Sequence, residues 1–317
     1  MRRELSGLQG ITDPPGARAA GGAVLALVLL TGGALLLRAR PSVTRKVAPD
    51  PVPRSLHAAA AGLCASVLAD SAVEHYRANF ENPGMVSPLA VSALGTLLGA
   101  QAAMGAGKRP GLRRGVYGLA VATGLAGFGF HIYNLLRKPG GVCWQNLFYA
   151  APIGAPAALG LGGALGLAAD HVARATNEPA RIAGAKAGRA LCALVAAGLA
   201  GTVGEVSLLH FRGSFQNPLM WLPVTLPPIA ALLTAGSAIE RPHAPGHRFT
   251  RAWLRLTAAL GVGGVGFHAY GVSRAMGGWR NWSQNVLDGP PLPAPPSFSA
   301  LAVAGLAALR LREREDA

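Results

Sequence analysis

The sequence predicts an all-α polytopic membrane protein with about nine transmembrane helices: one N-terminal helix followed by two parallel four-helix repeats. Three observations lead to this fold class. The 317 residues are 51% hydrophobic and only 14% charged, with a mean hydropathy of +0.34. Apolar stretches recur along the chain at lengths that match a bilayer, and two long segments of the chain are similar to each other.

The first expected span covers residues 19–37, which contain no charged side chain. At about 1.5 Å of rise per residue, a helix of this length crosses a hydrocarbon core roughly 30 Å thick. Arg38 and Arg40 follow it instead of a small-residue cleavage site, so we interpret the segment as a retained helix and not as a signal peptide. The polar tail of residues 1–18 precedes it.

Eight further apolar stretches predict the remaining helices, and the last of them is short. They fall into two segments of four, residues 57–170 (repeat 1) and 189–312 (repeat 2). The expected spans are residues 57–75, 85–107, 115–136, 148–169, 190–210, 219–239, 252–272 and 296–309.

The basic residues predict the orientation of these helices. The net charge is +15, and 20 of the 29 Lys and Arg residues fall on one side of the predicted membrane, in alternate loops and the C-terminal segment. Because cytoplasmic loops carry the excess of Lys and Arg, we expect the N-terminus outside and the C-terminus in the cytoplasm of a cell (inner) membrane protein. The basic charge is therefore explained by topology, with the lipid bilayer as partner and no nucleic acid.

Three collinear blocks of the two segments match. Asp70–Met85 aligns with Glu205–Met220 at an offset of 135, and Gly124–Gly141 aligns with Gly261–Gly278 at an offset of 137. A third block, Gln145–Pro156, aligns with residues 284–295 at an offset of 139. Four spans per repeat make the two repeats parallel, so equivalent residues lie at the same depth. The repeated polar residues all fall at the outer ends of the helices.

Four repeated histidines are candidate ligands of a haem b or a metal ion: His75, His131, His210 and His268. Glycines share a helix face with two of them, which permits either close helix packing or a flat cofactor. Without a C-x-x-C-H motif, any haem is bound non-covalently. The sequence also allows the plainer interpretation that these histidines hydrogen-bond between helices. The arginines available for haem propionates are Arg77, Arg137, Arg212 and Arg274.

Asp70 and Glu205 occupy equivalent positions inside their spans. Carboxylates within a membrane are candidates for a proton or ion pathway, although a hydrogen-bonded helix junction explains them equally well. Each acid lies five residues before a histidine of the same helix, roughly 140° around it, so one helix does not bring the two groups onto one face. Any contact between them requires another helix.

Six amide side chains form the remaining polar part of the expected outer rim. Asn-Pro dipeptides are typical of turns, so two of these asparagines are expected in structural hairpins, whereas the two Gln-Asn pairs either line a vestibule or dock on the partner repeat. The six residues are Asn82, Asn217, Gln145, Asn146, Gln284 and Asn285. The other histidines, among them His57, His171 and His247, have no repeated partner and are expected in or beside cytoplasmic loops.

Three functions remain open from the sequence. The first is a membrane subunit of a redox or electron-transfer system, with a redox partner or membrane complex. The second is a transporter or permease with a pathway between the repeats, and the third is a non-catalytic scaffold or assembly factor. No P-loop, nucleophile elbow, HExxH or zinc-type cysteine pair is present, so we do not expect an enzyme that acts on its own.

Overall fold

The computed structural model describes residues 50–106, 109–149, 151–175, 179–240 and 246–315. These residues are almost entirely helical, and the only strands among them, β1 (Arg181–Ile182) and β2 (Ala185–Lys186), form one antiparallel hairpin. The all-α class is therefore confirmed for this part of the chain. The expected first span, residues 19–37, lies outside the described residues.

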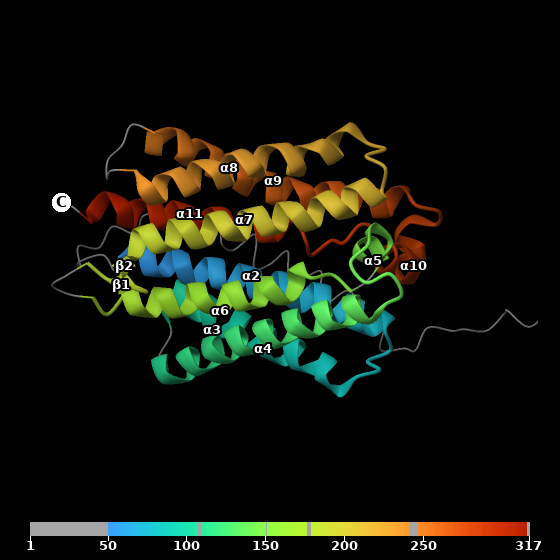
Figure 1. Ribbon diagram of the computed structural model, residues 1–317, viewed down its shortest axis with the longest axis horizontal. Helices are drawn as coiled ribbons and strands as arrows, with labels where there is room; N and C mark the ends of the chain where they lie inside the picture. The colour runs from blue at the N-terminus through green and yellow to red at the C-terminus, as the bar shows by residue number, and fades with distance from the viewer. Residues whose placement is uncertain (1–49, 107–108, 150, 176–178, 241–245, 316–317) are drawn as a thin grey trace, which may run out of the picture.

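Eight long helices coincide with the eight other expected spans, and Figure 1 shows them running side by side along one axis. Prolines open several of them, where a missing backbone N–H costs nothing, and the Asp50 carboxylate caps the first by accepting a hydrogen bond from Val52 N at 3.0 Å. The long helices are α2 (Pro51–Arg77), α3 (Val86–Ala103), α4 (Pro110–Arg137), α6 (Gly154–Val172), α7 (Ala187–Arg212), α8 (Leu222–Ile239), α9 (Gly246–Arg274) and α11 (Pro296–Arg314).

Short elements connect the long helices at one end of the molecule. They are the 3₁₀ turns η1 (Pro83–Met85), η2 (Pro218–Trp221) and η3 (Gly278–Asn281), and the single-turn helices α5 (Trp144–Tyr149) and α10 (Trp282–Leu287). Figure 1 shows α5 and α10 at the end opposite to the β1–β2 hairpin. We refer to these two ends as the α5/α10 end and the hairpin end.

Five segments of the described chain are long and apolar enough to cross a membrane: Pro51–Arg77, Pro83–Ala103, Pro110–Arg137, Ala187–Arg212 and Pro218–Ile239. The other three long helices, α6, α9 and α11, are not apolar enough over the length needed to cross a membrane. The described chain thus has several apolar helices, as expected of a membrane protein.

The long helices pack as two groups of four. In the first group α2 contacts α3 and α6, and α4 contacts α6; in the second, α7 contacts α8 and α11, and α9 contacts α11. The groups meet where α2 packs on α11 and α6 on α7. Apolar side chains of these four central helices, including Leu63, Leu165, Leu199 and Leu301, form the middle of the core.

The glycine faces of α4 and α9 are occupied by neighbouring helices. A methyl group built on Gly124 would lie 2.7 Å from the carbonyl oxygen of Pro156, and one on Gly261 would lie 2.7 Å from that of Pro295. Gly127 is similarly close to Pro156. These glycines therefore allow α4 to approach α6, and α9 to approach α11, and they leave no space for a flat cofactor at these contacts.

Candidate functional site

His75 and His210 lie at the α5/α10 end, in the last turns of α2 and α7. The Nδ1 of His75 is 2.6 Å from the carbonyl oxygen of Met85, and the Nδ1 of His210 is 2.8 Å from that of Met220. Each ring also meets a phenylalanine edge to face, Phe80 or Phe215. The histidines thereby tie the ends of α2 and α7 to the 3₁₀ turns that follow.

His131 and His268 make the same kind of contact from α4 and α9. The Nδ1 of His131 is 2.5 Å from the carbonyl oxygen of Pro152, and that of His268 is 2.7 Å from the carbonyl oxygen of Pro291. Both acceptors precede the last long helix of their group, where the prolines interrupt regular backbone hydrogen bonding. The His131 ring therefore provides a partner for the Pro152 carbonyl, while the Pro291 carbonyl also accepts a turn hydrogen bond from Ala294 N at 3.3 Å.

These four hydrogen bonds determine which ring nitrogen carries the hydrogen. A carbonyl oxygen can only accept, so each Nδ1 is the donor and the Nε2 of a neutral ring has a free lone pair. No Nε2 of the four makes a hydrogen bond with another described residue, and all four side chains are partly exposed. A histidine that ligates a metal commonly has this arrangement, with its other nitrogen held by a carbonyl.

The fold brings the four histidines together as two pairs. His131 lies within electrostatic range of His75, and His268 lies within range of His210. The described residues contain no group of three or more His, Cys, Asp or Glu side chains that could hold a metal ion. Any ligation at this end therefore rests on two histidines per site.

Asp70 and Glu205 also lie near each other, within electrostatic range, but their surroundings differ. Oε2 of Glu205 accepts a hydrogen bond from the backbone N–H of Gly154 at 3.1 Å, at the start of α6. The corresponding residue of the second group is Pro293, whose nitrogen has no hydrogen. The Asp70 carboxylate has no hydrogen bond with any described residue. One acid is thus anchored to the backbone and the other is not.

Arg77 and Arg212 both have protein partners. Arg77 pairs with Glu74 at 3.0 Å and with Asp288 at 3.4 Å. Arg212 donates to the carbonyl oxygen of Phe148 at 3.0 Å, and its guanidinium lies over the Tyr149 ring. These contacts hold the loops of the α5/α10 end and use part of the N–H donors of each guanidinium.

Asn82 and Asn217 shape the hairpins that follow α2 and α7. Their Oδ1 atoms accept hydrogen bonds from Gly84 N at 2.8 Å and Leu219 N at 2.9 Å, which caps η1 and η2. The chain reaches these caps through residue pairs with positive φ: Asn79 and Phe80 before η1, and Ser214 and Phe215 before η2. The two asparagines therefore have a clear structural role.

Asn146 and Asn285 are buried and hold the loops that lead into α5 and α10. Asn146 Nδ2 donates to the carbonyl oxygens of Pro139 at 3.0 Å and Gly141 at 2.8 Å. Asn285 Nδ2 makes the matching pair of bonds, to Met276 at 3.1 Å and Gly278 at 2.8 Å. Of the glutamines, Gln145 is exposed, and Gln284 accepts a hydrogen bond from Asn281 at 2.9 Å.

A buried polar network at the hairpin end of the first group was not predicted from the sequence. His57, expected in or beside a loop, is 4% exposed, and its Nδ1 lies 3.0 Å from the Tyr117 hydroxyl. Its Nε2 lies 3.6 Å from Oδ1 of Asp170, and Arg113 forms an ion pair with the same oxygen. We call these four residues the His57 network. Their spacing along three helices, without a repeated motif, is a weak sequence signal.

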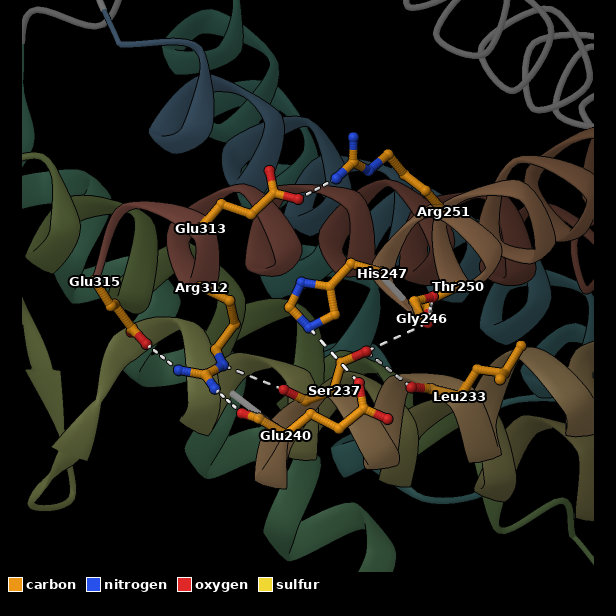
Figure 2. Close-up of polar contacts among 10 residues, drawn as sticks. All are labelled: Leu233, Ser237, Glu240, Gly246, His247, Thr250, Arg251, Arg312, Glu313 and Glu315. Carbon is orange, nitrogen blue, oxygen red and sulfur yellow. Dashed lines mark hydrogen bonds and ion pairs between the residues drawn. The ribbon is translucent and has the colours of Figure 1, made fainter. Parts of the chain in front are cut away.

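The second group has a different polar cluster at its hairpin end, which Figure 2 shows around Arg312. This guanidinium is 1% exposed and donates to the carbonyl oxygens of Ser237 and Glu240 at the end of α8 and to the Glu315 carboxylate. Glu315 in turn accepts from the N–H of Gly188 at 2.6 Å, at the start of α7. This cluster satisfies backbone groups at two helix ends.

His247 lies beside this cluster and was also expected near a loop. It is 2% exposed, and neither ring nitrogen has a hydrogen-bond partner. The closest charged group is Glu240, whose Oε2 is 3.9 Å from Nε2. Burial lowers the pKa of His247, while the nearby Glu240 carboxylate opposes this effect.

Comparison of the chain with protein-family models, with curated proteins and with solved structures found no match. The candidate site at the α5/α10 end is therefore defined by its own geometry. It consists of two pairs of histidines with their Nε2 lone pairs available, next to one anchored and one unanchored carboxylate.

Proposed function

We propose that this chain is a membrane subunit of a redox system that holds haem b or a metal ion through the Nε2 atoms of His75, His131, His210 and His268. One observation carries the proposal: all four Nδ1 atoms donate to backbone carbonyls, which presents all four Nε2 atoms as ligands. A purely structural histidine needs no such uniform choice of tautomer.

The pairing of the histidines favours haem over a bare metal ion. A bound ion usually takes three or more protein ligands, whereas haem iron needs at most two, because the porphyrin supplies the other four. The described residues form no group of three or more ligands, but they do form two pairs of histidines. When bound, the haem would supply one-electron chemistry, and the histidines would hold it in place.

The proposal includes the architecture expected from the sequence. Nine spans in two parallel repeats, with the N-terminus outside and the C-terminus cytoplasmic, would place both histidine pairs near the outer face of a cell (inner) membrane. His75 and His210 make the same kind of hydrogen bond to a backbone carbonyl, and so do His131 and His268. This correspondence supports equivalent roles for the two groups of helices. A redox partner would then dock at the α5/α10 end.

An absorption spectrum tests this function directly. Protein purified in detergent from haem-replete, metal-supplemented cells is expected to show a haem spectrum that changes on addition of dithionite. His131→Ala and His268→Ala should each remove about half of the bound cofactor, and the double variant should remove all of it. His171→Ala, an exposed histidine at the hairpin end, is the control and should change nothing. A colourless and metal-free wild-type protein contradicts the proposal.

A transporter with a pathway between the two groups of helices is the second candidate. Asp70 favours it, because an unpaired carboxylate close to Glu205 and inside an apolar helix is costly unless it binds a proton or a cation. Proteoliposome flux should fall strongly in Asp70→Asn and less in Glu205→Gln, since the glutamine oxygen can still accept from Gly154. Flux that is identical in the wild type and both variants excludes this role for the acids.

A further inference from the structure

The His57 network is not needed for packing the helices that carry it. At the offset of 135, His57 corresponds to Cys192 of the second group. At the offset of 137, Arg113 and Tyr117 correspond to Thr250 and Leu254, and at the offset of 139 Asp170 corresponds to Leu309. Cys192, Leu254 and Leu309 are fully buried in the apolar core. The same arrangement of helices is therefore built around apolar side chains in one group and charged ones in the other.

Contacts of two glycines support this correspondence. A methyl group built on Gly166 would collide with the Tyr117 ring, and one built on Gly305 would lie 2.9 Å from Cδ2 of Leu254. Gly166 and Gly305 are themselves 139 residues apart, on α6 and α11. Tyr117 and Leu254 thus fill the same place in the two groups.

The His57 network also differs in kind from the cluster around Arg312. The Arg312 cluster satisfies carbonyl and N–H groups at helix ends, so its charges have a structural use. The polar contacts of the His57 network are all between side chains: His57 with Tyr117, His57 with Asp170, and Arg113 with Asp170. Replacing a buried ion pair with apolar residues is often neutral or stabilising, so stability does not explain these four side chains.

We propose that the His57 network is a proton-binding site, in which a proton on His57 competes with Arg113 for the Asp170 carboxylate. Both cationic groups approach the same oxygen atom, Oδ1 of Asp170. Arg113 lies in the first turn of α4 at the hairpin end, so its guanidinium has a short path to the surface. Proton uptake by the imidazole would then weaken the contact of Arg113 with Oδ1, while Nε of the same guanidinium still donates to Oδ2 of Asp170 at 3.3 Å.

The groups around the ring indicate where the proton goes. The Asp170 carboxylate is the acceptor nearest to Nε2, at 3.6 Å, so the neutral imidazole is best placed with its hydrogen on Nε2, and the Tyr117 hydroxyl then donates to Nδ1. A hydronium ion from the aqueous side gives its proton to Nδ1 and leaves a water molecule. The Tyr117 hydroxyl turns so that its oxygen accepts from Nδ1–H, and Asp170 becomes the counter-ion of the imidazolium.

Few other ionisable groups face this site. On α2, Arg54 donates to the carbonyl oxygen of Ala103, and the Cys64 thiol lies near Tyr117. Helix α3 contributes no ionisable side chain, and on α11 Arg314 pairs with Asp50. His171 on α6 is exposed and bonded to the carbonyl oxygen of Arg181. The charges that act on His57 are therefore those of Asp170 and Arg113, in addition to the effect of its burial.

Nitrogen NMR of histidine-labelled protein in lipid nanodiscs tests the proposal. His57→Gln identifies the His57 signals, which are then followed over about pH 4.5 to 8. Removal of the competing cation in Arg113→Gln should raise the proton affinity of His57 about ten-fold or more, and removal of the counter-ion in Asp170→Asn should lower it by a similar factor. The exposed His171 provides reference signals that should be identical in the wild type and Arg113→Gln.

The outcomes separate the proposal from a purely structural network. A His57 titration in Arg113→Gln that is unchanged, or that never begins within this pH range, overturns it. If Asp170→Asn fails to fold, as judged by size exclusion, the Arg113→Gln result alone decides. Cofactor content plays no part in this measurement, so its result is independent of the haem proposal.

Discussion

Gly166 on α6 lies directly against the ring of Tyr117 on α4. A methyl group at Gly166 would be 2.5 Å from Cε1 of Tyr117, far inside van der Waals contact. The ring is fully buried in this position, and its hydroxyl reaches His57 on α2. A single glycine thus allows three helices of the first group to meet.

Gly166→Ala is expected to destabilise the protein by about 1–3 kcal/mol, because the added methyl group forces Tyr117 away from α6. Thermal unfolding in detergent measures this. Gly118→Ala, on α4, is the matched control, since no atom lies within 4 Å of the position its methyl group would take. Equal unfolding temperatures for the two variants would contradict the packing described here.

Replacing the whole His57 network with the residues of the second group should leave the protein as stable as the wild type or more so. The reason is that the quadruple variant His57→Cys, Arg113→Thr, Tyr117→Leu, Asp170→Leu removes buried charges together with their partners. Asp170→Leu alone should cost about 3–5 kcal/mol, because it leaves Arg113 buried without a counter-ion. Thermal unfolding and expression level compare the quadruple variant with Asp170→Leu. A quadruple variant less stable than Asp170→Leu would mean that the network is structural.

Asn217→Ala should destabilise the turn between α7 and α8 by about 0.5–2 kcal/mol, because Leu219 N loses its capping oxygen. Hydrogen exchange of the η2 amides should report the loss locally. Asn134→Ala, at an exposed position on α4, serves as the control and should leave exchange unchanged. Unchanged exchange at η2 in Asn217→Ala would argue against the cap.

His247 should make the protein less stable in acid. Burial lowers its pKa in the folded protein below the unfolded value of 6.5, so the unfolded chain binds more protons below that pH. Its contribution to stability is therefore constant above about pH 6.5 and falls as the pH drops below it. His247→Leu removes this dependence and an unpaired polar group, and should stabilise the protein by about 1–3 kcal/mol at low pH. A wild type and variant that lose stability in parallel on acidification would refute the assignment.

Long apolar stretches made the helices predictable, and the turn residues made their connections at the α5/α10 end predictable. Every described long helix covers a stretch that the hydropathy pattern indicated, and the Asn-Pro pairs at Asn82 and Asn217 do begin the returning segments. Both signals are local, because they depend on residues adjacent in the chain. The repeated histidines were recognised in the same way, although their hydrogen-bond partners were not.

Contacts between distant residues account for what the sequence did not indicate. His57, Tyr117 and Asp170 come from three helices, and none belongs to a repeated motif, so no spacing rule joins them. Gly124 and Gly261 favoured helix packing but also allowed space for a cofactor, and the position of Pro156 and Pro295 decided for packing at these contacts. The partner of Glu205, the N–H of Gly154, is a backbone group that side-chain patterns do not reveal.

Pro293 stands where the first group has Gly154, and this one difference removes a backbone donor. In a dimer of two identical chains, both acids would have been held in the same way, whichever residue stood there. Joining the two groups in one polypeptide allows them to differ, so that Glu205 accepts a hydrogen bond from the backbone while Asp70 has none with the described residues. If the acids serve the transport function proposed above, a cation or proton that reaches the α5/α10 end would meet two chemically different acids, and Asp70 would be the first to bind it.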